Sequence, residues 1–124
     1  MATFDLEATY LGIDANRITP LPGGPEFWKT VDRNAAAGGL LVTATTASGN
    51  SRHWEMHPNG DEALVLLEGE ARIVFERPAG DEVHAMAPGT TLIVPQGTWH
   101  RAETQRGYRM LYMTFGIGTQ HKPL

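Results

Sequence analysis

From Gly38 onward, short apolar runs alternate with turn residues at regular intervals. Val, Ile, Leu, Thr and aromatic residues fill the runs, and Gly, Pro, Asn and Asp separate them. This spacing favours a β-sandwich or barrel over alternating helices and strands. No segment carries a convincing helical stripe longer than about two turns. We predict strands at residues 39–48, 51–57, 62–68, 70–77, 82–87, 91–95, 99–104 and 107–116.

The first 35 residues follow a different pattern. The segment Thr19–Pro25 is rich in proline and glycine, which neither a helix nor a long strand tolerates well. Apolar residues on both sides of this segment are suited to packing against another surface. We therefore expect residues 1–35 to form an arm that packs on the barrel or on a partner subunit, and residues 36–124 to form a single barrel domain.

Two of the predicted strands are apolar on both faces. Residues 63–67 read Ala-Leu-Val-Leu-Leu, and residues 108–115 carry tyrosine, methionine, leucine and phenylalanine at neighbouring positions. One face of each strand can point into a barrel, so the other face needs a cover. A homodimer is the economical expectation, because a chain of this size seldom leaves such a patch exposed.

Composition and charge limit the expected partners and cellular location of the protein. The 124 residues carry a net charge of −4 and include no cysteine, which excludes disulfides and thiolate ligands. Lysine and arginine are scattered, whereas nucleic-acid binding usually needs a clustered basic face. No apolar stretch approaches the roughly 20 residues that cross a bilayer, and no secretory signal is visible. We expect a cytoplasmic protein without nucleic-acid or membrane partners.

The first candidate site segment is His53–Glu62. Side chains two positions apart on a strand share a face and lie about 7 Å apart, so Glu55 and His57 point the same way. His53 lies on that face too, but about 13 Å from His57 along an extended strand. We therefore prefer Glu55 to His53 as the partner of His57, and expect His53 to be a pocket-lining or rim group.

Two turns bring further groups toward the same place. The turn at residues 58–61 reverses the chain, and Glu62 opens what we expect to be the paired antiparallel strand. A second turn at residues 95–97 precedes His100. Two imidazoles and a carboxylate are what a divalent transition metal prefers when it keeps open coordination positions. By contrast, no serine lies in a nucleophile elbow, so covalent hydrolase schemes have little support.

These residues resemble the two sequence motifs of the cupin superfamily, over roughly residues 38 to 115. The later part of the first motif, with four residues between histidine and glutamate and six before the glycine, is matched by His57, Glu62 and Gly69. The second motif is matched by Gly89, Pro95, Gly97 and His100. The chain departs from the family at Glu55, where a histidine is usual, and at Thr104, where an asparagine is common.

The resemblance implies an all-β, double-stranded β-helix or jelly-roll barrel that binds one divalent metal ion. The resemblance implies that the ion is held by His57, Glu62 and His100, with Glu55 as a fourth ligand or an acceptor beside the site, and this set suits Fe, Mn, Ni or Zn. A second carboxylate favours harder ions such as Mn(II) or Fe(II). If the protein is an enzyme, the resemblance implies dioxygenation, decarboxylation or isomerisation of a small oxygenated metabolite, with an uncoordinated Glu55 acting as base.

Other interpretations of these residues stay open at this point. The pocket can be polar and metal-free, and Glu55 can instead pair with an arginine such as Arg52 or Arg101. The protein can be a non-catalytic module that binds a sugar, an acid or an aromatic metabolite, or a scaffold with a vestigial pocket. The residues expected either to line the cavity or to pack in the core are Tyr108, Met110 and Tyr112. The histidines expected on the surface are His84 and His121.

Overall fold

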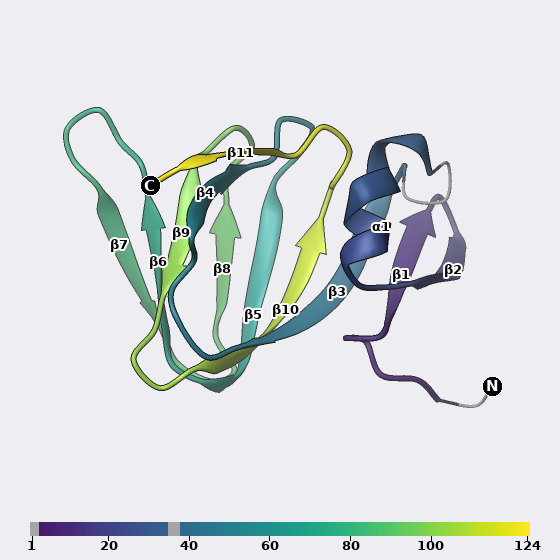
Figure 1. The fold of residues 1–124 in the computed structure, drawn as a ribbon, viewed down its shortest axis with the longest axis horizontal. Coiled ribbons are helices and arrows are strands. Elements are labelled where there is room, and N and C mark those ends of the chain that lie inside the picture. Colours follow the sequence, from purple (N-terminus) through teal and green to yellow (C-terminus); the bar gives the residue numbers. More distant parts are fainter. Residues whose placement is uncertain (1–2, 35–37) are drawn as a thin grey trace.

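The computed structural model describes residues 3–34 and 38–124, which form a barrel of two antiparallel sheets with a short helical segment at one side (Figure 1). The elements in chain order are β1 (Thr9–Asp14), β2 (Arg17–Pro22), α1 (Pro25–Thr30), the 3-10 turn η1 (Val31–Arg33), β3 (Leu40–Ala47), β4 (His53–Met56), β5 (Glu62–Gly69), β6 (Ala71–Phe75), β7 (Glu82–Met86), β8 (Thr91–Val94), β9 (His100–Glu103), β10 (Tyr108–Thr114) and β11 (Gln120–Pro123). Neither helix in the described parts of the chain is long and apolar enough to span a membrane.

The strands form a jelly roll, which confirms the fold class expected from the sequence. One sheet has the order β2-β1-β3-β10-β5-β8, and the other has the order β11-β4-β9-β6-β7. The eight strands expected between residues 39 and 116 correspond to β3 through β10, with bounds that agree to within two residues. The turn residues between the apolar runs account for this agreement, because they end each strand.

One expectation about pairing is wrong. Glu62 was expected to open a strand paired with the strand of Glu55 and His57, but β5 pairs with β10 and β8 in the opposite sheet. The chain between β4 and β5 therefore crosses from one sheet to the other rather than forming a hairpin. As a result, Glu62 faces the β4 residues from across the barrel.

The inward face of each central strand is polar at one end and apolar further along the strand. On β5, Glu62 is followed two and four residues later by the fully buried Leu64 and Leu66. On β10, Thr114 is buried at one end and Met110 is buried further back. Alternation therefore places polar groups at one end of the barrel and the apolar core next to them.

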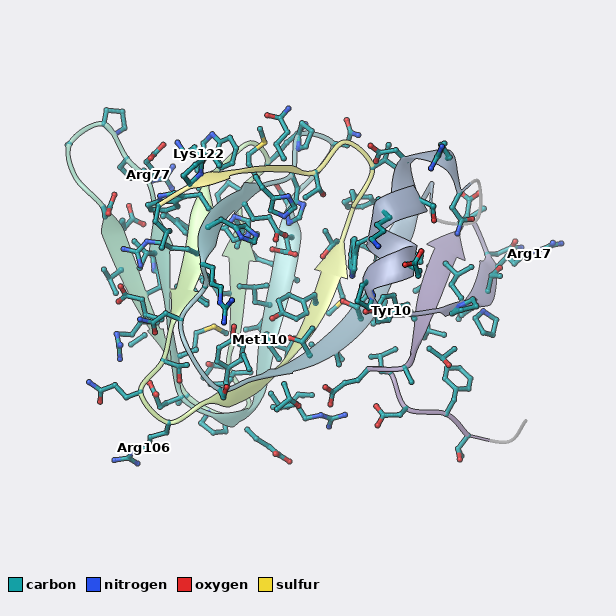
Figure 2. The ribbon with its side chains drawn as sticks, viewed as in Figure 1. Tyr10, Arg17, Arg77, Arg106, Met110 and Lys122 are labelled. Carbon is teal, nitrogen blue, oxygen red and sulfur yellow. The ribbon has the colours of Figure 1, made fainter. Side chains whose placement is uncertain are left out.

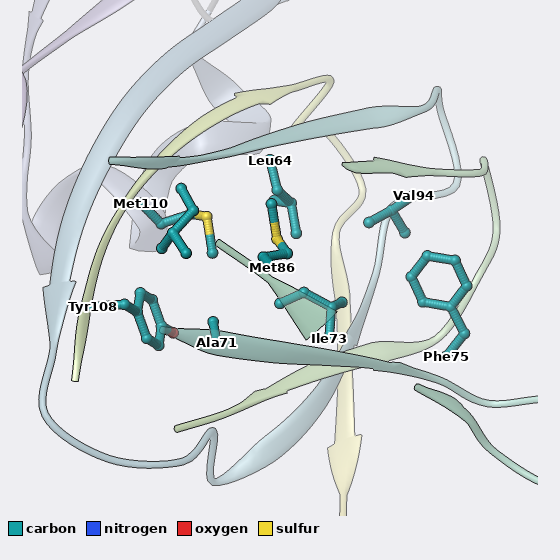
Figure 3. Packing of buried hydrophobic residues seen from close by; sticks show 9 residues of the cluster. Leu64, Ala71, Ile73, Phe75, Met86, Val94, Tyr108 and Met110 are labelled. Carbon is teal, nitrogen blue, oxygen red and sulfur yellow. The ribbon is translucent and has the colours of Figure 1, made fainter. Parts of the chain in front are cut away.

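The main apolar core joins the two sheets. Its buried members are Leu64, Leu66, Ala71, Ile73, Phe75, Met86, Val94, Tyr108 and Met110. Figure 3 shows Leu64 and Met110 from one sheet meeting Ile73 and Met86 from the other. In Figure 2, Met110 lies inside the barrel, whereas Arg17, Arg77 and Arg106 extend from the periphery of the molecule. This core fixes the spacing of the sheets beside the polar end.

The N-terminal segment extends the first sheet. β1 pairs with β3, and β2 is an edge strand that pairs only with β1. The segment Thr19–Pro25 thus contains the end of β2 and the first residue of α1. Prolines are tolerated there because an edge strand leaves one row of N–H groups unpaired and because proline suits the first turn of a helix. The expected domain boundary between residues 35 and 36 lies outside the described residues.

A second apolar cluster holds α1 against this sheet. Its members are Tyr10, Leu21, Phe27, Val31 and Leu41. The ring of Phe27 lies edge-on to that of Tyr10, with 5.1 Å between centroids, a geometry that favours aromatic pairs. Trp28, on the same helix, remains 40 % exposed. The packing of α1 therefore leaves one large aromatic side chain on the surface near the polar end of the barrel.

Candidate metal centre

Four side chains converge at the polar end of the barrel. Glu55 lies on β4, His57 follows the end of β4, and His100 opens β9 in the same sheet, directly opposite Glu55. Glu62, the first residue of β5, approaches from the other sheet. One ligand atom of each side chain lies within 4.8 Å of the others. The geometry thus brings together all four residues that the sequence suggested as ligands.

The contacts among these groups join imidazole nitrogens to carboxylate oxygens. His57 Nε2 lies 3.0 Å from Glu55 Oε1 and 3.2 Å from Glu62 Oε2. His100 Nε2 lies 3.1 Å from Glu62 Oε1. The side chains of His57, Glu62 and His100 are almost fully buried, while that of Glu55 is 37 % exposed. Glu55 is therefore the member of the cluster that meets solvent.

The outer nitrogens of both histidines are occupied. His100 Nδ1 lies 2.9 Å from the carbonyl oxygen of Thr98, which can only accept, so this nitrogen donates its proton. His57 Nδ1 lies 2.8 Å from Thr119 Oγ1. The Thr119 hydroxyl donates to the carbonyl of Gly116, and therefore it accepts from His57.

This arrangement decides which nitrogens face the cluster. With Nδ1 protonated in both rings, the neutral histidines turn their Nε2 lone pairs toward the oxygens of Glu55 and Glu62. Four electron-rich groups then point at one another. Either protons or a cation must lie among them, because burying unpaired charge is costly.

A threonine orients the buried carboxylate. Thr114 Oγ1 donates to Glu62 Oε2 over 2.6 Å, from the neighbouring strand β10. The other oxygen of Glu62 faces His100. Hydrogen bonds of this kind hold ligating side chains in position in metal sites.

The pKa values reflect strong coupling within the cluster. Burial opposes the charged form of His57, but the carboxylates of Glu55 and Glu62 outweigh it and raise its pKa to about 9. Burial likewise opposes charge on His100, and Glu62 raises its pKa. Burial favours neutral Glu62, yet the histidines His100 and His57 lower its pKa. The carboxylates are thus ionised at neutral pH, and a proton on His57 partly balances them in the absence of a metal ion.

The donor set fits a divalent metal ion. Among the residues that the structure describes, one buried side-chain polar atom has no hydrogen-bond partner, and it is His57 Nε2. Its two neighbouring oxygens are close but not aligned for a hydrogen bond. A metal ion satisfies such an atom through its lone pair. Two nitrogens and two carboxylates suit Mn(II) or Fe(II), and also accommodate Ni(II) or Zn(II).

A cavity of about 170 Å³ opens beside the cluster, inside the barrel. Its lining includes Arg52 and His53 together with Glu55, Glu62 and His100. The three residues expected either to line a cavity or to pack in the core, Tyr108, Met110 and Tyr112, all line this one. Burial raises the pKa of both tyrosines, so their hydroxyl groups stay protonated at neutral pH.

The structure corrects the arginine alternative for Glu55. The ion pairs of Glu55 are with His57 and His121, whereas Arg101 pairs with Glu103. Arg101 also lies over the ring of Trp54, on the outer side of β4. Arginine is therefore not the group that neutralises Glu55 within the described parts of the chain.

Several residues near the site were not indicated by the sequence. The carbonyl of Thr98 and the hydroxyls of Thr114 and Thr119 orient the cluster, but threonine is common in strands and turns and carries no signal. His121 is half-exposed, as expected, yet its Nε2 lies 3.3 Å from Glu55 Oε2. Its contact depends on β11, a strand that the sequence pattern did not predict.

Comparison with known proteins supports the resemblance seen in the sequence. Residues 42–113 match the profile of the Cupin domain family (Cupin_2). Among curated proteins, the uncharacterized protein YdbB of Bacillus subtilis (strain 168) is 32 % identical over 69 residues, which cover 56 % of this chain. The same match covers 53 % of YdbB, so the chain spans about half the length of that relative.

Solved structures share the fold at low sequence identity. Bacillus subtilis oxalate decarboxylase, described with its Mn(II) centres, is 19 % identical with a TM-score of 0.57, over 68 % of this chain and 24 % of that one. Hydroquinone 1,2-dioxygenase from Sphingomonas sp. TTNP3, with 4-hydroxybenzoate bound, is 15 % identical with a TM-score of 0.53, over 60 % and 58 %. These likenesses concern the fold alone. Because the profile match covers more than half of its residues, the chain belongs to the Cupin domain family.

Proposed function

We propose that this protein is a metal-dependent enzyme that binds one divalent ion at Glu55, His57, Glu62 and His100. The observation that carries the proposal is the orientation of the two histidines. Both Nδ1 atoms are held by oxygen acceptors, and both Nε2 atoms face carboxylates inside the barrel. Metal-binding histidines characteristically use one ring nitrogen for the ion and donate from the other.

The adjoining cavity supports a small substrate. A cavity of about 150 Å³ is enough to hold benzene, and the cavity here measures about 170 Å³. Apolar walls from Leu64, Ile73 and Met110 limit water, and Tyr108 and Tyr112 bring hydroxyl-bearing side chains to the same cavity. We therefore propose a small oxygenated substrate, such as a phenol or a short carboxylic acid.

The residues have separable roles in this proposal. The bound ion supplies Lewis-acid polarisation of a substrate oxygen. Tyr112, whose hydroxyl lies 2.9 Å from Thr45 Oγ1, and Tyr108 orient the substrate by donating hydrogen bonds. Glu55, the exposed carboxylate, accepts a proton from the substrate when it is not coordinated. The reaction that we propose is a dioxygenation, a decarboxylation or an isomerisation. The named activities of two structural neighbours, a dioxygenase and a decarboxylase, support the first two.

A metal analysis followed by a substrate screen tests the proposal. Untagged protein grown with Mn, Fe, Ni and Zn should contain one ion at this site by mass spectrometry of the metals. His100→Ala should lose that ion, whereas His84→Ala should keep it, because His84 lies on the edge strand β7 and contacts Glu82. Oxygen uptake and carbon dioxide release are then measured with small phenols and acids. A metal content of His100→Ala that equals that of the unaltered protein contradicts the proposal.

A non-catalytic binding module is the alternative function. It predicts saturable binding of a small phenol or acid with no product formed by the metal-loaded protein. The same titration, followed by chromatography of the ligand, separates the two functions. Recovery of unchanged ligand across all four metals favours the module.

We also propose a homodimer. Outward-facing Ala63, Val65 and Leu67 on β5 are only half-buried, and Ile93 on the neighbouring edge strand β8 is 53 % exposed. A second copy of the chain, packed against this face, would remove these apolar side chains from water. Light scattering coupled to size exclusion should give twice the chain mass, and Ile93→Lys should shift it toward the monomer.

A further inference from the structure

A second group of metal-binding side chains lies just outside the first. His53 and Glu55 come from β4, and His121 comes from β11. The two strands are paired, with His121 opposite Glu55 in the register. One ligand atom of each of the three side chains lies within 4.8 Å of the others. A backbone ladder therefore holds these three groups together, rather than a loop.

The carboxylate of Glu55 lies between the two groups. Its Oε1 lies 3.0 Å from His57 Nε2, on the buried side. Its Oε2 lies 3.3 Å from His121 Nε2, on the exposed side. Each oxygen of one carboxylate thus faces a different imidazole. A carboxylate in this position is able to bind two cations at once, one through each oxygen.

The three side chains are accessible and close together. The rings of His53 and His121 meet edge to face, with 4.6 Å between centroids. A surface cavity of about 420 Å³ is lined by these residues together with Trp28, Val31, Asp32 and Thr119. The contact between Glu55 and His121 is an exposed ion pair, which contributes little to stability. Such a pair alone gives no reason for His53 to lie in the same place.

We infer that His53, Glu55 and His121 form a second divalent-cation site, and that Glu55 bridges it to the proposed metal centre inside the barrel. The bridging part rests on the proposed function, whereas the presence of the outer site does not. Because two of its three ligands are imidazoles and it is open to water, the outer site suits Zn(II), Ni(II) or Cu(II). The inner group has two carboxylates and suits harder ions.

The bridge has a chemical consequence. A cation on the outer side draws Glu55 Oε2 outward and adds positive charge next to the inner cluster. Occupancy of one site therefore changes the affinity of the other, by the same factor in both directions. In the enzyme, zinc at the outer site also occupies Oε2, the Glu55 oxygen that the inner ion leaves free. This oxygen then cannot accept a proton, so zinc suppresses turnover without displacing the inner ion.

Zinc stoichiometry tests the inference. Untagged protein, first freed of metal, is titrated with ZnCl₂ in a calorimeter and then analysed for bound zinc after gel filtration. We expect two zinc ions per chain for the unaltered protein and for the control His84→Ala. We expect one ion per chain for His53→Ala, for His121→Ala and for His100→Ala. His53→Asn and His121→Gln serve as second variants if an alanine variant does not fold.

The outcomes separate this inference from the proposed function. One ion per chain that is kept by His53→Ala and His121→Ala but lost in His100→Ala overturns the outer site and leaves the inner one standing. One ion that is kept by His100→Ala but lost in His121→Ala supports the outer site and overturns the inner one. No bound zinc, or one zinc shared by two chains on gel filtration, overturns the outer site.

Discussion

The Nδ1 atom of His57 lies 2.8 Å from the hydroxyl oxygen of Thr119, and this contact determines which nitrogen of the ring faces the barrel. The hydroxyl proton of Thr119 is directed to the carbonyl of Gly116, so the hydroxyl can only accept from His57. Thr119 belongs to the turn that precedes β11. The C-terminal strand therefore takes part in the site through both Thr119 and His121.

Removing this acceptor should weaken metal binding. Thr119→Val keeps the shape of the side chain but leaves His57 Nδ1 without a partner, so the ring loses its fixed tautomer. Changes to such supporting groups typically reduce metal affinity by about 10- to 100-fold. We expect a loss in this range for Mn(II), measured by electron paramagnetic resonance of the free ion. Thr91→Val, at an exposed position of β8, is the matched control and should bind as the unaltered protein does. Equal affinities for all three proteins would falsify the role of Thr119.

The metal-free protein should lose stability as the pH rises. The pKa of His57 increases from 6.5 to about 9, so its proton stabilises the fold fully below pH 6.5. This contribution, on the order of 3 kcal/mol, is lost as the pH rises through about 9. Thermal unfolding of chelator-treated protein between pH 6 and pH 10 measures it.

The metal-loaded protein provides the comparison for that experiment. A bound ion takes the place of the proton on His57, so metal binding releases protons and the alkaline decline should be absent. His57→Gln without metal should be less stable below pH 6.5 and should show a flatter profile between pH 6.5 and pH 9. An identical alkaline slope with and without metal contradicts both the raised pKa and the position of the ion.

Glu55→Gln should lower the affinity of the inner cluster for its metal ion without abolishing binding. His57, Glu62 and His100 remain, but the charge of one ligand is lost. Since loss of a supporting group already costs about tenfold or more, loss of this ligand should cost at least as much. Titration with Mn(II) measures the change, and Glu76→Gln, an exposed carboxylate paired with Lys122, is the control. Unchanged Mn(II) affinity in Glu55→Gln indicates that Glu55 is not a ligand.

Much of the barrel and the members of the inner cluster were predictable from the sequence, because both follow from local patterns. Turn residues end the strands β3 to β10, and the same turns precede Glu62 and His100. The pairing of β5 was not predictable in this way. Alternation of side chains gives the face that a strand buries, but it does not say which strand lies beside it. Glu62 therefore reached the expected place from an unexpected sheet.

The contribution of the C-terminus was missed for a related reason. β11 is short and polar, and its residues are mostly exposed, so neither alternation nor hydrophobicity marks it as a strand. Its position depends on backbone pairing with β4, a long-range contact. The sequence predicts that His121 is a surface histidine, and its exposure agrees with that prediction. What the sequence could not show is that the same surface adjoins Glu55 of the site.

Glu70 should stabilise the fold at neutral pH, but not in strong acid, through its contacts with the turn after β9. The hydroxyl of Thr104 lies 2.7 Å from Glu70 Oε1, which also accepts from the backbone N–H groups of Gln105 and Arg106. These bonds, led by that of Thr104, lower the pKa of Glu70 from 4.5 to about 2. Its contribution is therefore present above pH 4.5 and lost as the pH falls through about 2. In urea unfolding, Glu70→Gln should be less stable than the unaltered protein at pH 7, and the difference should shrink toward pH 2. Glu26→Gln, at an exposed position on α1, should show no such convergence, and a pH-independent difference for Glu70→Gln would rule out this role.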